Sequence, residues 1–331
     1  MAVLVTGGAG YIGSHVVLSL LDAGRQVVVL DDLSTGDARL VDPRATMVVG
    51  DVGDPQVLDA IMDDHPIDAV MHFAAHISVP ESTHEPLKYY LNNVAKTIAL
   101  LRRCQTWDVT RVVFSSTAAV YGEPDDLPVT EEAPRRPINP YGRGKKMVED
   151  ILRDWASTGD AEFVGLRYFN VAGADPQMRS GQSNPQAGHL IKVGVRAALG
   201  LHPQLQIFGD DYSTPDGTCI RDYLHVSDLA DVHRLALRYL EEGKPSCFFN
   251  AGYGQGVSVR QVLDAVAQVS GVDIQPTVGR RRPGDPARLV ADNQRLVDAL
   301  GWRPRFDDLS TIIEHALRWE RKLHDHQPNG S

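Results

Sequence analysis

Two residues in the middle of the chain have the types and the spacing for proton transfer. Tyr141 and Lys145 stand four residues apart in the stretch INPYGRGKKMVED. Asn139 is a favourable helix N-cap and Pro140 suits the first helical position, so the stretch predicts a helix with both side chains on one face. An ammonium about 5 Å from a phenol favours the phenolate by roughly 3 kcal/mol at an effective dielectric constant of about 20. The pair therefore predicts a tyrosine whose pKa is lowered enough for acid–base catalysis near neutral pH.

A hydroxyl group that could share this proton is expected at the carboxyl end of a nearby strand. The segment FSST, which closes a predicted strand at 110–116, supplies Ser115, Ser116 and Thr117. A serine or a threonine can serve in such a hydrogen-bond relay, although the threonine side chain has less rotational freedom. The residues alone leave the choice among the three open.

A glycine-rich stretch near the N-terminus predicts a loop that binds a dinucleotide. TGGAGYIG places Gly7, Gly10 and Gly13 between a strand and a helix. Glycine there permits a tight turn and lets the backbone approach a pyrophosphate at the helix N-terminus. The next strand ends in VVVLDD, where the carboxylate of Asp31 can accept from the ribose hydroxyls of an adenosine and would repel a 2′-phosphate. Because no arginine directly follows Asp31, the pattern favours NAD over NADP.

Composition excludes several other classes of function. The chain has 331 residues and a formal net charge of −10, with no basic run, so a nucleic-acid-binding surface is not expected. Cys104, Cys219 and Cys247 are widely spaced, which fits neither a disulfide framework nor a zinc knuckle and favours a reducing compartment. The 12 histidines show no metal-ligand spacing. With no leader-like or membrane-spanning apolar run, we expect a cytoplasmic protein with no metal and no membrane partner.

The arrangement of apolar segments predicts the fold that positions these groups. Continuous β-branched runs at 2–6, 26–30, 45–49, 68–74, 110–116 and 162–169 alternate with helical patterns. Strands of this kind are buried on both faces, so we expect a Rossmann-like doubly wound parallel α/β sheet. After about residue 172, a loop rich in Gly, Pro and Ser leads to helices mixed with short strands. We expect an NAD-binding domain at 1–172, to which about 218–255 returns, a smaller mixed α/β substrate-binding domain at 173–322, and a tail at 323–331.

The glycine order G-x-x-G-x-x-G combined with Y-x-x-x-K resembles the extended branch of the short-chain dehydrogenase/reductase superfamily. In that family pattern, the hydroxyl partner of the tyrosine falls on Thr117. RYFNVAGA (167–174), IFGDDYSTPDGTCIRDYLHVSDLA (207–230) and RRRPGD (280–285) further resemble the UDP-glucose 4-epimerases (UDP-galactose 4-epimerases). This resemblance extends from the first strand to about Trp319, and it implies a homodimer built on the helix at 86–104 and the Tyr141 helix.

The resemblance also implies which residues hold the two ligands. Those expected at NAD are Gly7, Gly10, Tyr11, Ile12, Gly13, Asp31, Asp32, Asp51, Val52, Phe73, Ala74, Ala75, Asn93, Ser115, Lys145 and Tyr168. Those expected at a UDP-sugar are Thr117, Tyr141, Asn170, His189, Leu190, Ile207, Phe208, Arg221, Arg282 and Asp285. Ile77 stands where some relatives carry a lysine near the cofactor phosphates.

The physical chemistry of four of these residues suits a UDP-sugar. Arg221 and Arg282 can grip a diphosphate through charge-assisted hydrogen bonds, Asp285 can accept from the uridine ribose, and Phe208 can flank the uracil. Two simpler interpretations remain for the arginines. Arg221 could form a surface ion pair with Asp222, and Arg282 could belong to a solvated cluster with its two neighbouring arginines.

The residues after Thr117 indicate the reaction. Dehydratases of this superfamily carry an Asp-Glu pair there, whereas this chain has Ala118 and Ala119, whose methyl groups cannot move protons. We therefore expect reversible C4 epimerisation of UDP-galactose and UDP-glucose through a 4-keto intermediate. Other UDP-sugars (UDP-N-acetylglucosamine, UDP-glucuronate or a UDP-pentose) and a non-catalytic NAD-binding regulator are the alternatives. Leu289, at a position that selects for the C2 substituent in relatives, does not decide among the sugars.

Overall fold

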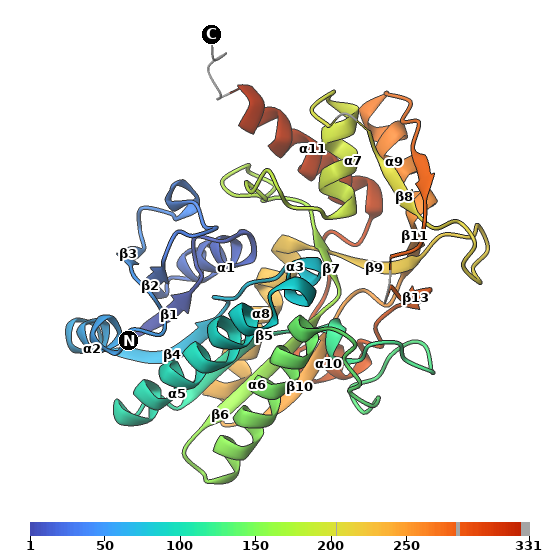
Figure 1. The fold of residues 1–331 in the computed structure, drawn as a ribbon. Coiled ribbons are helices and arrows are strands. Elements are labelled where there is room, and N and C mark those ends of the chain that lie inside the picture. Colours follow the sequence, from blue (N-terminus) through green and yellow to red (C-terminus); the bar gives the residue numbers. More distant parts are fainter. Residues whose placement is uncertain (203, 283–284, 326–331) are drawn as a thin grey trace.

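The structure, a computed structural model, describes residues 1–202, 204–282 and 285–325 (Figure 1). Two parts of the sequence-based predictions therefore lie outside the described residues. These are residues 326–331 of the expected tail and residues 283–284 within the RRRPGD segment.

A seven-stranded parallel sheet organises the larger part of the molecule. Its strand order is β10-β6-β5-β4-β1-β2-β3. In chain order the strands are β1 (Ala2–Thr6), β2 (Gln26–Asp31), β3 (Thr46–Val49), β4 (Ile67–His72), β5 (Arg111–Thr117), β6 (Glu162–Tyr168) and β10 (Cys247–Ala251). The order reverses between β1 and β4, and ligands of open α/β sheets bind in the crevice outside the carboxyl ends of the strands at such a point. The predicted doubly wound sheet is confirmed.

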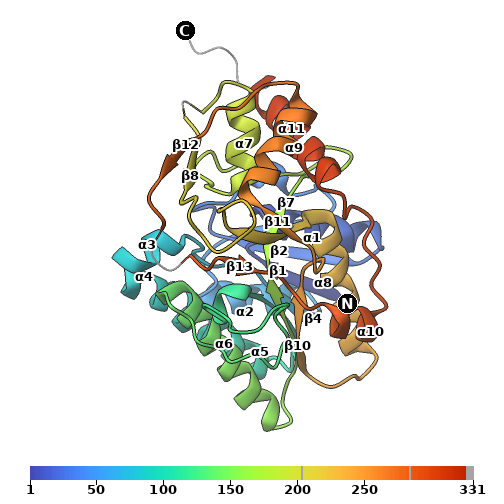
Figure 2. The same ribbon diagram turned by 90° about the vertical axis from the view of Figure 1, so that its right-hand side faces the viewer.

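Helices cover both faces of this sheet. Figure 2 shows α1 (Tyr11–Asp22) and α8 (Val226–Glu241) on one side, and α5 (Lys96–Thr106) and α6 (Pro140–Ser157) on the other. Alternate strand residues point to opposite faces, so β1 sends Val3 and Val5 into the core with α1 and α8, and Leu4 into the core with α5. Both faces are thereby buried, as the continuous apolar runs require. Helix α2 (Pro55–Asp64) packs beside α5, and α10 (Gln294–Leu300) packs on the α8 side.

A short helical segment leads into α5. Helices α3 (Val79–His84) and α4 (Pro86–Tyr90) follow β4, and a single π-helical stretch, η2 (Leu91–Ala95), joins α4 to α5. Two 3₁₀ turns, η1 (Ala38–Leu40) and η3 (Ala118–Val120), follow β2 and β5. The η3 turn directly after Thr117 fixes how the chain leaves the carboxyl end of β5.

A smaller lobe lies above the carboxyl edge of the sheet (Figure 1). Its helices α7 (Leu190–Ala198), α9 (Val259–Ser270) and α11 (Leu309–Asp325) share a core of their own. Its strands are β7 (Asn170–Ala172), β9 (Ile220–His225), β11 (Gly256–Ser258) and β13 (Arg288–Leu289) in one sheet, and β8 (Gln206–Phe208) with β12 (Thr277–Gly279) in another. Between β9 and β11 the chain returns to the large sheet as α8 and β10, so it crosses between the two lobes several times.

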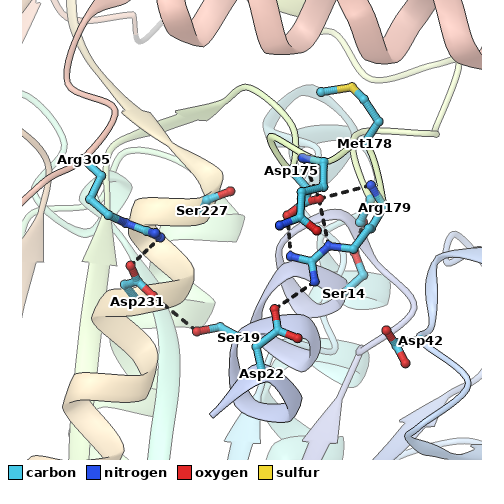
Figure 3. A network of polar contacts seen from close by, with 12 residues as sticks. Ser14, Ser19, Asp22, Asp42, Asp175, Met178, Arg179, Ser227, Asp231 and Arg305 are labelled. Atoms are coloured by element: carbon cyan, nitrogen blue, oxygen red, sulfur yellow. Dashed lines mark hydrogen bonds and ion pairs between the residues drawn. The ribbon is translucent and has the colours of Figure 1, made fainter.

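A network of ion pairs fastens the smaller lobe to α1 and α8 (Figure 3). Arg179, on the loop after β7, binds Asp175 and Asp22 at 2.8 Å each, and Asp22 belongs to α1. Arg305, on the segment before α11, binds Asp231 of α8 at 2.6 Å. Partly exposed pairs of this kind contribute about 1 kcal/mol or less each. Their main consequence is geometric, because they fix one loop of the smaller lobe against α1, the helix that begins at the glycine-rich loop, and another against α8.

Candidate active site

The first turn of α6 has the geometry that the sequence predicts. The side chain of Asn139 accepts a hydrogen bond from the backbone N–H of Gly142 at 2.8 Å, and Pro140 is the first helical residue. Helix α6 therefore begins at Pro140, and Tyr141 and Lys145 lie one turn apart on the same face. That face is turned to the carboxyl end of β5, which carries Thr117.

Lys145 is buried against β5, with 3% of its surface exposed. Its ammonium donates to the carbonyl oxygen of Ser115 at 2.6 Å and lies over the ring of Phe114, 4.8 Å from the ring centroid. Burial lowers the lysine pKa to about 7, while the carboxylate of Glu149 acts in the opposite direction. The lysine is therefore close to the point at which it loses its charge at neutral pH.

The phenol of Tyr141 differs from the sequence-based prediction. Burial raises its pKa above the ordinary value, and the hydrogen bond with Thr117 opposes this only in part. The prediction that Lys145 lowers this pKa is wrong for the chain alone, because the cost of desolvating a phenolate exceeds the stabilisation that the neighbouring groups supply. Thr117 also accepts a hydrogen bond from the backbone N–H of Ala119 at 3.1 Å, which orients its hydroxyl.

The backbone of the glycine-rich loop packs so closely against itself and its neighbours that side chains on Gly7 and Gly13 would not fit. A Cβ on Gly7, which has φ of +71°, would lie 2.6 Å from the backbone nitrogen of Ala74. A Cβ on Gly13 would overlap the carbonyl oxygen of Gly7. Gly10, the N-cap of α1, has no side chain to cap the helix, so the amides of its first turn remain available to an anion. This cradle fits a pyrophosphate, with Tyr11 and Ile12 in the first turn of α1.

The acidic residues expected near the adenosine have different surroundings. Asp31 is buried and accepts from the backbone N–H groups of Ala9 and Leu33 at 2.9 Å each, so its carboxylate is fixed at the end of β2. Asp32 is exposed and binds the backbone and hydroxyl of Ser34. Asp51 forms an ion pair with Lys96 of α5 at 2.6 Å, and no sequence pattern predicts this partner.

Val52 belongs to the apolar core below these acidic residues. The segment after β4, which carries Phe73, Ala74 and Ala75, runs beside the glycine loop, because the backbone N–H of Phe73 donates to the carbonyl of Thr6 at 2.9 Å. The strand consequently ends at His72, sooner than the predicted 74.

Two further residues expected at the cofactor already have protein partners. The amide of Asn93 accepts from the backbone N–H of His76 and donates to its carbonyl, both at 2.8 Å. The hydroxyl of Tyr168 makes a short hydrogen bond with His233 of α8. The first contact fixes the segment after β4 to η2, and the second fixes the end of β6 to α8. Ile77, one residue after His76, is exposed and adds no charge there.

Arg221 and Asp285, which the sequence assigns to different parts of a UDP-sugar, are paired with each other. A guanidinium nitrogen of Arg221 donates to the carboxylate of Asp285, and another donates to the carbonyl of Ile220 at 2.8 Å. The alternative pair with Asp222 is not formed. That carboxylate is buried and accepts instead from backbone N–H groups, including those of Tyr253 and Gly254 at 2.9 Å.

Arg282 and Phe208 are also in contact. The guanidinium carbon of Arg282 lies 3.7 Å from the centroid of the Phe208 ring. This distance indicates a cation–π contact, although Arg282 remains exposed beside Arg280 and Arg281, so the alternative of a solvated cluster stays open. The neighbouring Ile207 is buried in the core beneath, so only its backbone can face a ligand. Leu289 on β13 is the register partner of Arg221 on β9 and is half-buried.

The remaining residues expected at the substrate lie on the edge of the smaller lobe that the starts of β7 and α7 form. Asn170 is exposed at the start of β7, His189 is exposed as the residue that precedes α7, and Leu190 is half-buried as its first residue. The hydroxyl of Tyr11 donates to the carbonyl of Gly173 at 2.8 Å and so joins the glycine loop directly to this edge.

Sequence reasoning missed one buried residue next to the Tyr141–Lys145 pair. Glu149 follows Lys145 by four residues, a spacing that could have been noticed, and its side chain is completely buried. No group of three or more His, Cys, Asp or Glu residues in the described part of the chain is arranged to hold a metal ion. Within residues 1–202, 204–282 and 285–325, no helix has the length and apolar character needed to cross a membrane.

Comparisons with known proteins agree with this architecture. A model of the NAD dependent epimerase/dehydratase family matches residues 3–252. The chain is 54% identical to UDP-glucose 4-epimerase of Azospirillum brasilense over 321 residues, which are 97% of this chain and 92% of that protein. A solved UDP-glucose 4-epimerase has a TM-score of 0.95 at 45% identity and covers 100% of this chain and 99% of its own. UDP-glucose-4-epimerase from Stenotrophomonas maltophila, with bound NAD and formylated UDP-arabinopyranose, has a TM-score of 0.95 at 41% identity, with 98% and 99% covered.

The glycine cradle gives a direct prediction for cofactor binding. Gly13→Ala forces the carbonyl of Gly7 away from the start of α1, and such overpacking costs about 1–3 kcal/mol. We expect NAD affinity to fall about tenfold or more, measured as the NAD that each purified protein releases on denaturation. Gly188→Ala is the control, because a Cβ there meets nothing within 4 Å. A Gly13→Ala protein with the NAD content of the wild type would show that this loop does not hold the cofactor.

Proposed function

Because the chain belongs to the NAD-dependent epimerase/dehydratase family, we propose that it interconverts UDP-galactose and UDP-glucose at C4 with tightly bound NAD. The observation that carries the proposal is the bond from Lys145 to the Ser115 carbonyl, because it brings the Tyr141 helix to the strand end that carries Thr117. The full-length similarity to UDP-glucose 4-epimerases supports the same assignment. Ala118 and Ala119 beside Thr117 supply no acid or base for an elimination, which favours epimerisation over dehydration.

The cofactor would be held at the switch point of the sheet. The amides at the start of α1 would bind the pyrophosphate, and Asp31 would accept from the adenosine ribose through lone pairs that its two backbone partners leave unused. When bound there, NAD would supply the acceptor and later the donor of the C4 hydride, and its oxidised ring would add a positive charge near the phenol. That charge supplements Lys145, which alone does not overcome the burial of Tyr141.

The proton steps belong to the side chains of this protein. Tyr141, as the phenolate, takes the proton of the sugar 4-hydroxyl, and Thr117 shares the hydrogen bond. Lys145, in its ammonium form, favours the phenolate by its charge and does not itself transfer a proton. After the 4-keto sugar has turned over relative to the diphosphate, Tyr141 returns its proton to the newly formed 4-alkoxide. The sugar therefore undergoes no net oxidation.

The turning of the sugar requires a firm hold on UDP. Arg221 and Arg282 would bind the diphosphate, Asp285 the uridine ribose and Phe208 the uracil, with Asn170, His189, Leu190 and the backbone of Ile207 around them. In the protein alone these groups neutralise or cover one another, as Arg221 with Asp285 and Arg282 with Phe208. Binding would exchange these internal contacts for contacts with the nucleotide.

The proposal is tested by following the conversion of UDP-galactose to UDP-glucose by proton NMR in the absence of added NAD. We expect wild-type protein to reach an equilibrium mixture of the two sugars. Tyr141→Phe should lower the rate about 10²–10⁴-fold at unchanged NAD content, because it removes only the group that carries the proton. Tyr239→Phe on α8, which packs on the opposite face of the sheet, is the matched control and should keep the wild-type rate. A wild-type protein that converts no UDP-galactose, or a fully active Tyr141→Phe, would refute the assignment.

We also propose that the chain forms a homodimer through α4–α5 and α6. Leu87 and Leu91 on the first of these are 75% and 65% exposed, and Ile98 and Met147 are exposed beside them. The helices pack together, since the α4 segment contacts α6, so these side chains form one apolar surface. Such a surface suits a second copy of the chain. The cysteines Cys104, Cys219 and Cys247 are free and buried, which supports a reducing, cytoplasmic compartment.

A charge on this surface should separate the subunits. Leu91→Glu places a carboxylate where the proposed interface would bury it, so we expect a monomer of about half the dimer mass in light scattering coupled to gel filtration. Val272→Glu, at an exposed apolar residue after α9, is the control and should leave the mass unchanged. Equal masses for wild type and Leu91→Glu would place the interface elsewhere.

A further inference from the structure

Beneath the Tyr141–Lys145 pair lies a carboxylate that uses all of its hydrogen-bonding capacity inside the protein. Glu149 is 0% exposed. One oxygen accepts from the hydroxyl of Ser116 at 2.6 Å and from Nε of Arg167 at 2.9 Å. The other accepts from Nη2 of Arg167 at 2.8 Å and from Nη1 of Arg135 at 3.0 Å. The carboxylate is therefore held in one orientation by donors from three segments of the chain.

The main partner of Glu149 is itself immobilised. Arg167 is completely buried on β6, and its remaining nitrogen donates to the hydroxyl of Tyr121 at 2.7 Å and to the carbonyl of Glu131 at 3.0 Å. The hydroxyl of Tyr121 donates in turn to Asn250 on β10 at 2.7 Å. Since each of these donors and acceptors is satisfied within the protein, Glu149 occupies a fixed point relative to the end of β5.

Two hydrogen bonds tie two consecutive residues of β5 to α6. Lys145 holds the carbonyl of Ser115, and Glu149 holds the hydroxyl of Ser116. Thr117, which hydrogen-bonds Tyr141, is the next residue. A shift of the strand end relative to the helix would break both bonds, so the pair of clamps sets the distance between the hydroxyl and the phenol.

Among the groups that surround Lys145, Glu149 is the one whose charge bears on the protonation of the lysine. On β5 the lysine meets the Phe114 ring and a carbonyl, neither of which carries a charge. His72 of β4 is neutral, because burial lowers its pKa to about 3 and both its ring nitrogens contact threonine hydroxyls. In the protein without its cofactor, burial raises the pKa values of Tyr141 and of Tyr168 on β6, so neither phenol adds a negative charge there. Glu149 is the charge that favours the ammonium form of Lys145.

We propose that Glu149 is a positioning residue for the reaction, which keeps Lys145 in its ammonium form and locks the end of β5 to the catalytic helix. The inference rests on the proposed function, since it concerns how that reaction depends on pH. Arg135 lies on the other side of Glu149, with 17% of its side chain exposed, and its positive charge weakens the effect of Glu149 on Lys145. Glu149 and Arg135 thus act on Lys145 in opposite senses.

The signs of the charges on Glu149 and Arg135 set the direction in which each substitution should move the pKa of Lys145. Burial lowers the pKa of Lys145, and the charge of Glu149 raises it. Removing that charge lowers the pKa further, so in Glu149→Gln the alkaline limb of the kcat/KM profile should move to lower pH, by about one pH unit. Removing the opposing cation in Arg135→Gln should move the same limb to higher pH. A purely structural role would reduce activity at every pH without moving the limb.

The experiment is a pH profile of UDP-galactose conversion between about pH 6 and pH 10 for the holoenzyme and its variants. Ser116→Ala removes one clamp without a change of charge, so it should lower kcat with the limb unmoved. Asp150→Asn is the matched control, because Asp150 also binds Arg135, at 2.6 Å, but is exposed. Limbs that move in opposite directions for Glu149→Gln and Arg135→Gln support the inference, and unmoved limbs in an active enzyme overturn it. If Glu149→Gln does not fold, the position of the alkaline limb in Arg135→Gln decides whether the inference holds. An inactive wild type would instead refute the proposed function.

Discussion

The site depends on one hydrogen bond between a helix and a strand, from the ammonium of Lys145 to the carbonyl of Ser115 at 2.6 Å. It brings α6 against the carboxyl end of β5, and the phenol of Tyr141 meets the hydroxyl of Thr117 only in that arrangement. Burying an ammonium is costly, and the surroundings offset the cost with a carbonyl, an aromatic face and the negative charge of Glu149. The result is a lysine whose pKa is about 7, so its charge responds to every neighbouring group.

The charged groups expected at the substrate also have partners inside the protein. Arg221 is paired with Asp285, and Arg282 lies on the ring of Phe208. Isolated cations in a half-buried crevice would be unfavourable, so the protein gives each one an internal partner. These partners are the groups that we assign to the ribose and the base. A nucleotide that separates them would meet cation, acceptor and ring together, which suits firm binding of UDP and looser contact with the sugar.

Local signals made much of the site predictable. The cap at Asn139, the proline after it and the four-residue spacing place α6 correctly, because they act within one turn of helix. The positions of the glycine loop and of Asp31 could likewise be predicted from the sequence, since a strand, a tight turn and a helix start lie within a short segment. The alternation of apolar runs with helical patterns was sufficient for the doubly wound sheet.

Contacts between distant segments were not predictable from one sequence. The raised pKa of Tyr141 depends on how deeply several elements bury the ring, and spacing along one helix carries no such information. The pair of Arg221 with Asp285 joins residues on separate strands and loops, as does the contact of Asn93 with His76. Glu149 could be noticed from its spacing, but its bonds to Ser116 and Arg167 appear only when β5 and β6 lie side by side.

In the proposed reaction, the hydrogen at C4 leaves and returns to the same sugar without exchange with water. UDP-galactose that carries deuterium at C4 tests it most directly, when it is incubated with the holoenzyme in ordinary water and the UDP-glucose formed is analysed by mass spectrometry and NMR. We expect the product to retain the deuterium at C4, since the proton on Tyr141 exchanges with water but the hydride does not. Product UDP-glucose that carries hydrogen from water at C4 would contradict it.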